Sequence, residues 1–447
     1  MLYDQTVIHP GALAFTLMAG VLMLLLPRRY VIVPFLVAGV FIPIQQRLVI
    51  ASLDFYMLRI LILFGWTRLL LRSEYRGLKL NALDKGMILW AVAGIISYTF
   101  LWETERAFIN RLGISFDVLG SYFLIRCLVR DLQDITFVVK ALAVICVPLA
   151  IAMLIERATG RNAFAVFGGV PEFTLIRDGR LRCQGAFVHP ILAGTFGASL
   201  LPLFLSLKWQ PEAGKRFAII GGLAATIITF TSSSSGPLIT YVAGLAGLCL
   251  WPLRRNMRLI RWGMAYLVIG LHLRMQAPVW ALLARVEVVG CSTGYHRYYL
   301  FDEFINRFDE WWLWGVKSTA HWGDHLFDVT NQFVRIGVDG GLITLGLFIA
   351  LIVLCYRNLG QALWTRGRRW PERILIWALG ASLFAHLISF WGVSYFDQII
   401  VAWYLLLAVI ATAGGFPSKS QNAQPLLHYR KLERERVPPG MPGLSCL

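Results

Sequence analysis

Residues 134–155 read DITFVVKALAVICVPLAIAMLI and contain only two charged side chains. A helix rises about 1.5 Å per residue, so about 20 such residues cross the hydrocarbon core of a bilayer. Twelve further apolar segments occur along the 447-residue chain. We therefore predict an all-α protein, a polytopic transmembrane helical bundle of about 12–13 spans. The thirteen candidates centre on residues 11–27, 31–45, 53–71, 84–101, 108–125, 134–155, 185–207, 217–231, 236–252, 259–275, 333–356, 373–391 and 396–415.

The composition of the whole chain supports this reading. Apolar residues make up 57% of the sequence, charged residues only 15%, and the mean hydropathy is +0.63, which is well beyond the usage of soluble domains. No signal peptide is expected, because residues 1–10 contain Asp4 and no basic region, so the run from Gly11 to Leu26 reads as a retained first span. The seven cysteines show no metal-ligand spacing and are expected to be packing residues.

The net charge of +17 is explained by topology. Placing the N-terminus outside puts 25 of the 42 Lys and Arg residues on the cytoplasmic side, as the positive-inside rule requires, so nucleic acid is not an expected partner. Residues 1–415 then form the integral membrane domain, and residues 416–447, polar and rich in proline, read as a disordered cytoplasmic tail. The two longest loops, about 156–184 and 276–332, both fall outside, where chemistry is expected.

The first external loop holds five arginines, although positive-inside sorting disfavours basic residues there. Arginine presents a planar fork of donors that binds phosphate bidentately, which suits a lipid pyrophosphate at the membrane surface. Interfacial snorkelling to lipid headgroups is the other reading, and it is weakest for Arg180 and Arg182, next to the span that begins at Gly185. The five are Arg157, Arg161, Arg177, Arg180 and Arg182.

Several motifs in order resemble the bacterial O-antigen ligase/polymerase family. Residues 182–190, RCQGAFVHP, are similar to its R-x-x-G-x-F-x-x-P-like entry to a span. The segment 231–236, TSSSSG, is similar to a T-x-S-R-G element with serine in place of arginine. Residues 294–300 and 314–317 resemble elements that open the large loop. Residues 328–342, DVTNQFVRIGVDGGL, resemble the return to the membrane, but Thr330 stands where many members have a catalytic histidine.

The resemblance implies a GT-C-type glycosyltransferase in the bacterial inner membrane that uses glycans on undecaprenyl pyrophosphate at the external face, without metal, nucleotide sugar or other cofactor. Such transfer needs cations for the departing phosphate and a base for the acceptor hydroxyl. The expected cations are Arg182 and Arg297, with Arg180 as a further candidate. Arg335, just after Asn331, is a candidate for reaching the phosphate, and Asn331 is counted with the substrate-binding residues. The expected bases are His321 and His325, with Asp324 and Asp328 as orienters or alternatives.

Other readings of these residues stay open. The i, i+4 spacing of His321 and His325 would place both on one helix face as a metal pair, although no third ligand is evident. Either histidine can instead be a hydrogen-bonded interfacial residue. His189, before Pro190, is expected to cap the backbone of a span-entry turn. Tryptophans 311, 312, 314 and 322 suit either sugar stacking or the membrane interface.

The acceptor distinguishes two activities. A polymerase passes the glycan to another lipid-linked unit, whereas a ligase passes it to a lipid or a protein, and Thr330 in place of histidine gives a slight lean to the polymerase. Polysaccharide-assembly proteins are possible partners. The rival from another class is a transporter or flippase of a lipid-linked glycan or other anion, which predicts charged residues through the middle of several spans.

Overall fold

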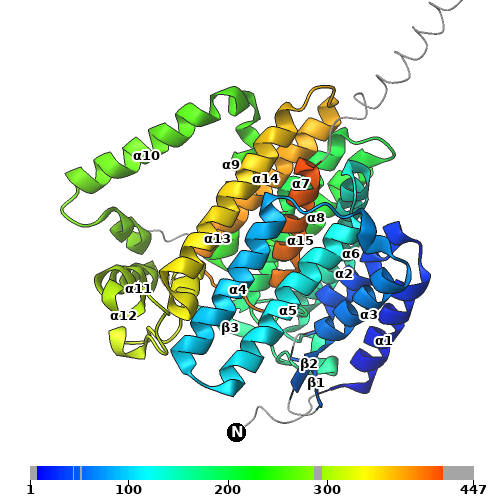
Figure 1. Cartoon of the computed structure of the whole chain (residues 1–447), viewed down its shortest axis with the longest axis horizontal. Coiled ribbons are helices and arrows are strands. Elements are labelled where there is room, and N and C mark those ends of the chain that lie inside the picture. The colour runs from blue at the N-terminus through cyan, green and yellow to red at the C-terminus, as the bar shows by residue number, and fades with distance from the viewer. Residues whose placement is uncertain (1–7, 44, 51–52, 286–293, 416–447) are drawn as a thin grey trace, which may run out of the picture.

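The computed structural model describes residues 8–43, 45–50, 53–285 and 294–415, and this part of the chain is a helical bundle (Figure 1). Its strands form two short antiparallel hairpins. One pairs β1 (Arg47–Ile50) with β2 (Leu53–Tyr56), and the other pairs β3 (Leu175–Arg177) with β4 (Arg180–Arg182). The all-α class is confirmed for the described residues, and the predicted tail at 416–447 lies outside them.

Every predicted span coincides with a helix. These helices are α1 (Pro10–Leu25), α2 (Ile32–Phe41), α3 (Met57–Leu71), α4 (Ala82–Trp102), α5 (Glu105–Leu128), α6 (Leu132–Thr159), α7 (Pro190–Ser206), α8 (Gly214–Thr231), α9 (Ser235–Cys249), α10 (Met257–Arg274), α13 (Gln332–Trp364), α14 (Trp370–Phe390) and α15 (Ile399–Gly414). The large loop adds α11 (Gly294–Asn306) and α12 (Phe308–Trp311).

Fewer of these helices can cross a membrane than the 12–13 expected. Six of the described helices, α4, α5, α6, α7, α13 and α14, are long and apolar enough, and α9 with α10 makes a seventh if this pair, bent by 73°, counts as one span. The helix α2 has ten residues, about 15 Å, half of a hydrocarbon core. An apolar run in a sequence does not show where its helix ends, and this accounts for the excess.

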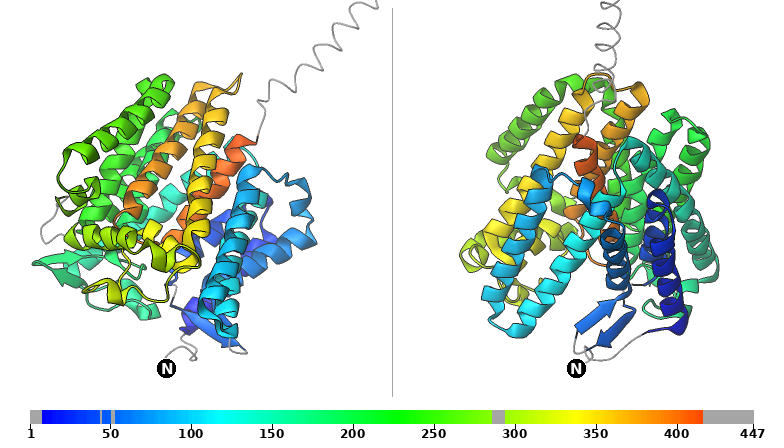
Figure 2. Two further views of the ribbon diagram at one scale, coloured as in Figure 1. Left: turned by 60° about the vertical axis from the view of Figure 1, so that its left-hand side comes forward. Right: turned by 45° about the vertical axis from the view of Figure 1, so that its right-hand side comes forward.

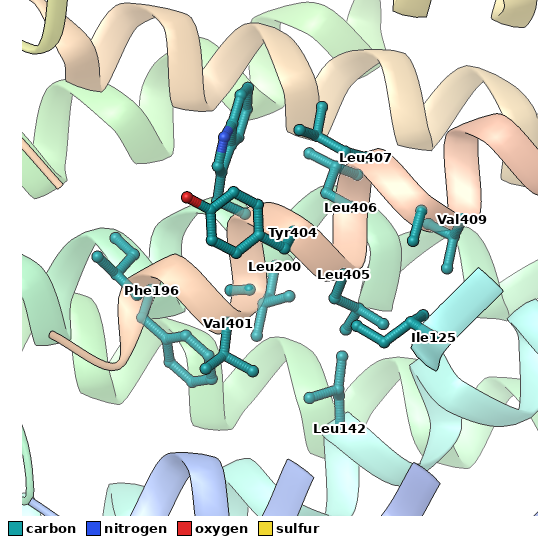
Figure 3. Packing of buried hydrophobic residues seen from close by; sticks show 14 of the residues in the cluster. Ile125, Leu142, Phe196, Leu200, Val401, Tyr404, Leu405, Leu406, Leu407 and Val409 are labelled. Carbon is teal, nitrogen blue, oxygen red and sulfur yellow. The ribbon is translucent and has the colours of Figure 1, made fainter. Parts of the chain in front are cut away.

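The helix α15 lies at the centre of the bundle. All but two of its residues are buried, because α5, α7, α13 and α14 pack around it. Figure 3 shows Val401 and Leu405 of α15 among Leu142 of α6 and Phe196 and Leu200 of α7. A helix enclosed by protein on every side is apolar all round, which explains why the hydropathy of this segment is high although it does not face lipid.

Three arginines within the helices form ion pairs with carboxylates. Arg59 of α3 holds Asp117 of α5 at 2.8 Å, and Arg126 of α5 holds Asp84 of α4 at 2.9 Å. Arg68, which is 1% exposed, pairs with Glu74 at 2.9 Å. These pairs neutralise the in-span arginines inside the protein, where a lone charge would be costly.

Hydrogen bonds and ion pairs between loops show which loops lie at the same end of the bundle. At one end, which carries the short basic loops, Arg28 pairs with Asp134, Arg72 donates to the carbonyl of Leu24, and Gln210 donates to that of Pro371. The opposite end carries both hairpins, α11 and α12 (Figures 1 and 2). The two long loops therefore share one end, and the Arg-rich short loops share the other.

The helix α13 is broken at Gly341, where φ is +71°. The chain after α12 crosses this break, because the N–H of Leu342 donates to the carbonyl of Trp312 at 2.8 Å and the N–H of Val316 donates to that of Val338 at 2.9 Å. A Cβ at Gly341 would lie 2.3 Å from the carbonyl oxygen of Leu313. The break thus fixes the large loop against α13.

We expect Gly341→Ala to destabilise the protein. The positive φ alone costs a non-glycine residue about 1–2 kcal/mol, and the clash with the Leu313 carbonyl adds to this. The control is Gly346→Ala on the same helix, where a Cβ meets nothing within 4 Å and alanine favours the helix. Thermal unfolding in detergent should show a lower midpoint only for Gly341→Ala. Equal midpoints for the two variants would contradict a close contact between Gly341 and the segment that follows α12.

Candidate phosphate-binding site

The loop that carries Arg182 is held in place from the end of α6. The buried carboxylate of Glu156 accepts hydrogen bonds from the N–H groups of Gln184 at 3.1 Å and Gly185 at 2.8 Å and from the Thr174 hydroxyl at 3.2 Å. On the other side, the Asn162 amide donates to the carbonyl of Gly185 at 2.7 Å. Buried polar groups with this many partners hold a single backbone path, so the residues that follow are positioned rigidly.

The start of α15 completes this support. Asp397 accepts from the N–H of Val188 at 2.7 Å, and the Gln398 amide donates to the carbonyl of Ala186 at 2.6 Å. The next residue, His189, caps α7, since its Nδ1 accepts from the N–H of Ile191 at 3.2 Å. The predicted capping role of His189 is confirmed.

Arg182 is buried, with 6% of its surface exposed. Its Nη2 and Nε donate to the hydroxyl of Ser234 at 2.7 and 3.3 Å. Burial lowers the pKa of Arg182, the neighbouring Arg177 lowers it further, and Asp178 opposes both. In the described part of the chain no carboxylate forms an ion pair with Arg182. The side-chain partner of its guanidinium there is the neutral hydroxyl of Ser234.

Arg297, on α11, is also buried, with 9% exposed. The side chain of Arg297 forms no hydrogen bond and no ion pair with the described residues, and its Nε is buried without a partner there. The guanidinium lies against Gly392, where a Cβ would come within 3.3 Å of Cζ. Burial lowers the pKa of Arg297, and Arg177 adds to the effect. Burying a cation without a counter-charge costs several kcal/mol of folding free energy. A protein that keeps such a cation is expected to bind an anion beside it.

One neighbourhood, the outer cationic cluster, contains Arg177, Arg182 and Arg297 together with the neutral His189. Arg182 is hydrogen-bonded to Ser234, and a Cβ at the nearby Gly236 would lie 3.9 Å from Ile191, the residue whose N–H His189 accepts. Arg177 lies close enough to lower the pKa of each of the other three. Burial lowers the pKa of His189 to about 4, Arg182 and Arg177 act in the same direction, and Asp328 opposes them. The imidazole is therefore uncharged near neutral pH. Of the carboxylates predicted as bases or orienters, Asp328 is the one whose charge acts on His189, and its carbonyl oxygen lies 3.1 Å from Nε2 of His296, the neighbour of Arg297.

The other residues predicted to bind phosphate are either exposed or engaged in contacts of their own. Arg180 is exposed on β4. Arg335 is half-exposed and pairs with Asp339 of the same helix at 2.9 Å. Asn331 is fully buried as the cap of α13, where its Oδ1 accepts from the N–H groups of Phe333 at 2.9 Å and Val334 at 3.2 Å, while its Nδ2 has no partner. These contacts give Arg335 and Asn331 structural tasks.

The predicted bases His321 and His325 lie at the surface of the large loop. His321 contacts Glu310 at 2.7 Å, and the same carboxylate accepts from Trp322 at 2.9 Å and from Arg307. Desolvation raises the pKa of Glu310, but the hydrogen bonds from Trp322, His321 and Arg307 outweigh it and bring the pKa to about 2. His321 is thus part of a surface ion cluster, and His325 and Asp324 are exposed.

The alternative of a histidine metal pair on a helix face is wrong. Residues Ala320–Trp322 form a single 3-10 turn, and His325 follows with φ at +60°, so no helix joins the two histidines. In the ranges that the structure describes, no three His, Cys, Asp or Glu side chains are grouped to hold a metal.

Two of the loop tryptophans form the loop's own core. Trp311 stacks on Phe304 at 3.9 Å and donates to its carbonyl at 2.7 Å, and Trp322 is 2% exposed. Trp314 stacks on Phe100 of α4 at 4.9 Å. Trp312 is exposed and therefore keeps the sugar-stacking and interfacial readings open.

Sequence reasoning did not single out Arg177, Ser234 or Gly392. A signal for Ser234 exists in the TSSSSG segment, whose resemblance to a T-x-S-R-G element puts a serine at the position of the arginine. Arg177 was one of five loop arginines with nothing local to distinguish it. Comparison of the sequence with protein-family models and with curated proteins finds no match.

Proposed function

We propose that this protein is a membrane glycosyltransferase that polymerises or ligates an oligosaccharide carried on undecaprenyl pyrophosphate. The reaction takes place at the end of the bundle that holds both long loops, which we assign to the external face of a bacterial inner membrane. The bundle is then of the GT-C type, with an external loop that contributes to the site.

The observation that carries the proposal is the buried guanidinium of Arg297, which has no partner among the described residues and which, like Arg182, lies within the influence of Arg177. A pyrophosphate supplies several anionic oxygens, which match the planar fork of arginine donors. The pairing of Arg59, Arg68 and Arg126 with carboxylates supports an enzyme over a transporter, because a transporter is expected to keep charged groups for its cargo through the middle of several spans.

In the proposed reaction, the acceptor hydroxyl oxygen attacks C1 of the first sugar on the donor. The bond between C1 and the phosphate oxygen breaks, and the lipid pyrophosphate leaves with the electron pair. Arg182 and Arg297 stabilise the charge that develops on the phosphate. The hydroxyl proton passes to a base. We assign this role to Asp328, because it is the candidate whose charge acts on His189 of the outer cationic cluster.

We expect Asp328→Asn to lower turnover by about 100-fold or more, since the amide cannot accept the proton. His321→Ala and His325→Ala should keep turnover close to that of the wild type, because His321 is held by Glu310 and neither histidine acts on the charges of the outer cationic cluster. Turnover of a lipid-linked oligosaccharide by the three purified variants tests this assignment. Full activity in Asp328→Asn together with loss in His321→Ala would transfer the role to the histidine.

The activity itself is tested by deleting the gene in its native host and separating the extracted glycans beside the lipid-linked intermediates. Loss of long polymer with accumulation of single lipid-linked units indicates a polymerase, which Thr330 slightly favours. Full-length polymer left on undecaprenyl pyrophosphate indicates a ligase. Unchanged glycans and intermediates would contradict both.

A further inference from the structure

We propose that His189 is a phosphate-binding residue whose neutral imidazole donates a hydrogen bond from Nε2 to an oxygen of the lipid pyrophosphate, beside Arg182. The inference rests on the proposed function and adds a group to its donor site. It also excludes His189 as the base, although it is the histidine that lies within the cationic cluster.

The helix cap fixes the tautomer. Nδ1 accepts the N–H of Ile191 at 3.2 Å, so Nδ1 carries no proton. The proton of the neutral ring is therefore on Nε2, which makes Nε2 a donor. Among the residues that the structure describes, none forms a hydrogen bond with Nε2 of His189. To act as a base, the ring would have to release the cap and accept the proton on Nδ1, which would make it an imidazolium.

The surrounding charges oppose the imidazolium. Arg182 on β4 and Arg177 on β3 disfavour a third positive charge, and Asp328 before α13 only partly offsets them. Burial acts in the same direction and is the largest influence, so the pKa of His189 is about 4. A neutral donor can share the pyrophosphate with the arginines without adding repulsion between cations.

The chain contains an internal control for the cap. His9 precedes Pro10 at the start of α1, as His189 precedes Pro190 at the start of α7. Nδ1 of His9 accepts from the N–H of Gly11 at 3.1 Å, and its ring contacts Phe167 edge-on, with the centroids 5.8 Å apart. His9 therefore shares the capping task but has no assigned part in the cluster.

The test uses His189→Asn and His189→Ser in the full chain, reconstituted in nanodiscs. Both replacements are neutral and good helix caps. Asparagine retains a donor beyond its capping oxygen, whereas the serine hydroxyl is too short to reach past the cap. Binding is measured with undecaprenyl pyrophosphate that carries no glycan, and turnover is measured with the lipid-linked oligosaccharide. His9→Asn and His9→Ser are the matched controls.

We expect His189→Ser to weaken binding of undecaprenyl pyrophosphate about tenfold or more, the effect of losing a hydrogen bond to a charged group. His189→Asn should lie between the wild type and His189→Ser, and both His9 variants should bind as the wild type does. The ratio of the affinities of His189→Ser and the wild type should stay constant from pH 5 to 8, because the ring does not titrate there.

Three results would overturn the inference. Wild-type affinity in His189→Ser would leave His189 with the cap alone. Unchanged affinity with a large loss of turnover in both His189 variants, and loss of the acidic limb of the pH profile, would make it a base. If the wild-type protein itself does not bind undecaprenyl pyrophosphate, the proposed function fails, and this outcome is distinct from a failure of His189 alone.

Discussion

Arg297→Met is expected to lower turnover of a lipid-linked oligosaccharide by about 100- to 1,000-fold, the effect of removing one preorganised donor from a developing oxyanion. The thermal unfolding midpoint should stay the same or rise. Arg297 is buried and has no partner among the described residues, so replacing it with an apolar chain of similar length removes a desolvated charge. Turnover and thermal unfolding are measured on the same reconstituted protein.

The matched control is Arg307→Met on the same loop. Arg307 is partly exposed and pairs with Glu303 at 2.7 Å and with Glu310 at 3.0 Å. Exposed ion pairs contribute little to stability because solvent screens them, so this variant should show a small loss of stability and nearly full turnover. The opposite pattern, a stable and active Arg297→Met, would show that the buried guanidinium serves packing alone.

Arg182→Ala is the second variant with a large expected effect. Its guanidinium is held by one neutral hydroxyl, and we expect turnover to fall about 100-fold or more when the charge is lost. Ser234→Ala should have a much smaller effect, because it removes the support of Arg182 and leaves its charge in place. Comparing the turnover of the two variants separates the effect of the charge of Arg182 from the effect of its positioning by Ser234.

Arg161→Ala controls for the basic character of the same loop. Arg161 is exposed and pairs with Glu172 at 3.6 Å, so its removal should leave turnover unchanged. Turnover is measured for Arg182→Ala, Ser234→Ala and Arg161→Ala at equal amounts of membrane-inserted protein. Equal losses in Arg182→Ala and Arg161→Ala would mean that the loop attracts anions only through its net charge.

The sequence predicts the helices well because hydropathy is a local property. Each apolar run became a helix, and the His189 cap followed from its place before Pro190. Helix ends and breaks depend on distant contacts, and so the sequence did not predict the break of α13 at Gly341, which exists because the Leu313 and Trp312 carbonyls cross there.

The candidate site was predicted in part. Arg182 and Arg297 were chosen from residue type and place, and the structure brings both near Arg177. The guanidinium of Arg297 packs against Gly392 in the loop after α14, and no local sequence pattern reveals this long-range contact. The spacing of His321 and His325 misled because it assumed a helix, whereas the backbone turns between them.

The central claim is tested most directly by incubating the protein, in sealed liposomes with undecaprenyl-pyrophosphate-linked oligosaccharide, and analysing all products by mass spectrometry. We predict free undecaprenyl pyrophosphate together with a glycan lengthened by one unit, formed with chelator present and without nucleotide sugar. Recovery of unchanged lipid-linked oligosaccharide in the opposite leaflet, with no bond broken, would contradict the account and identify a transporter.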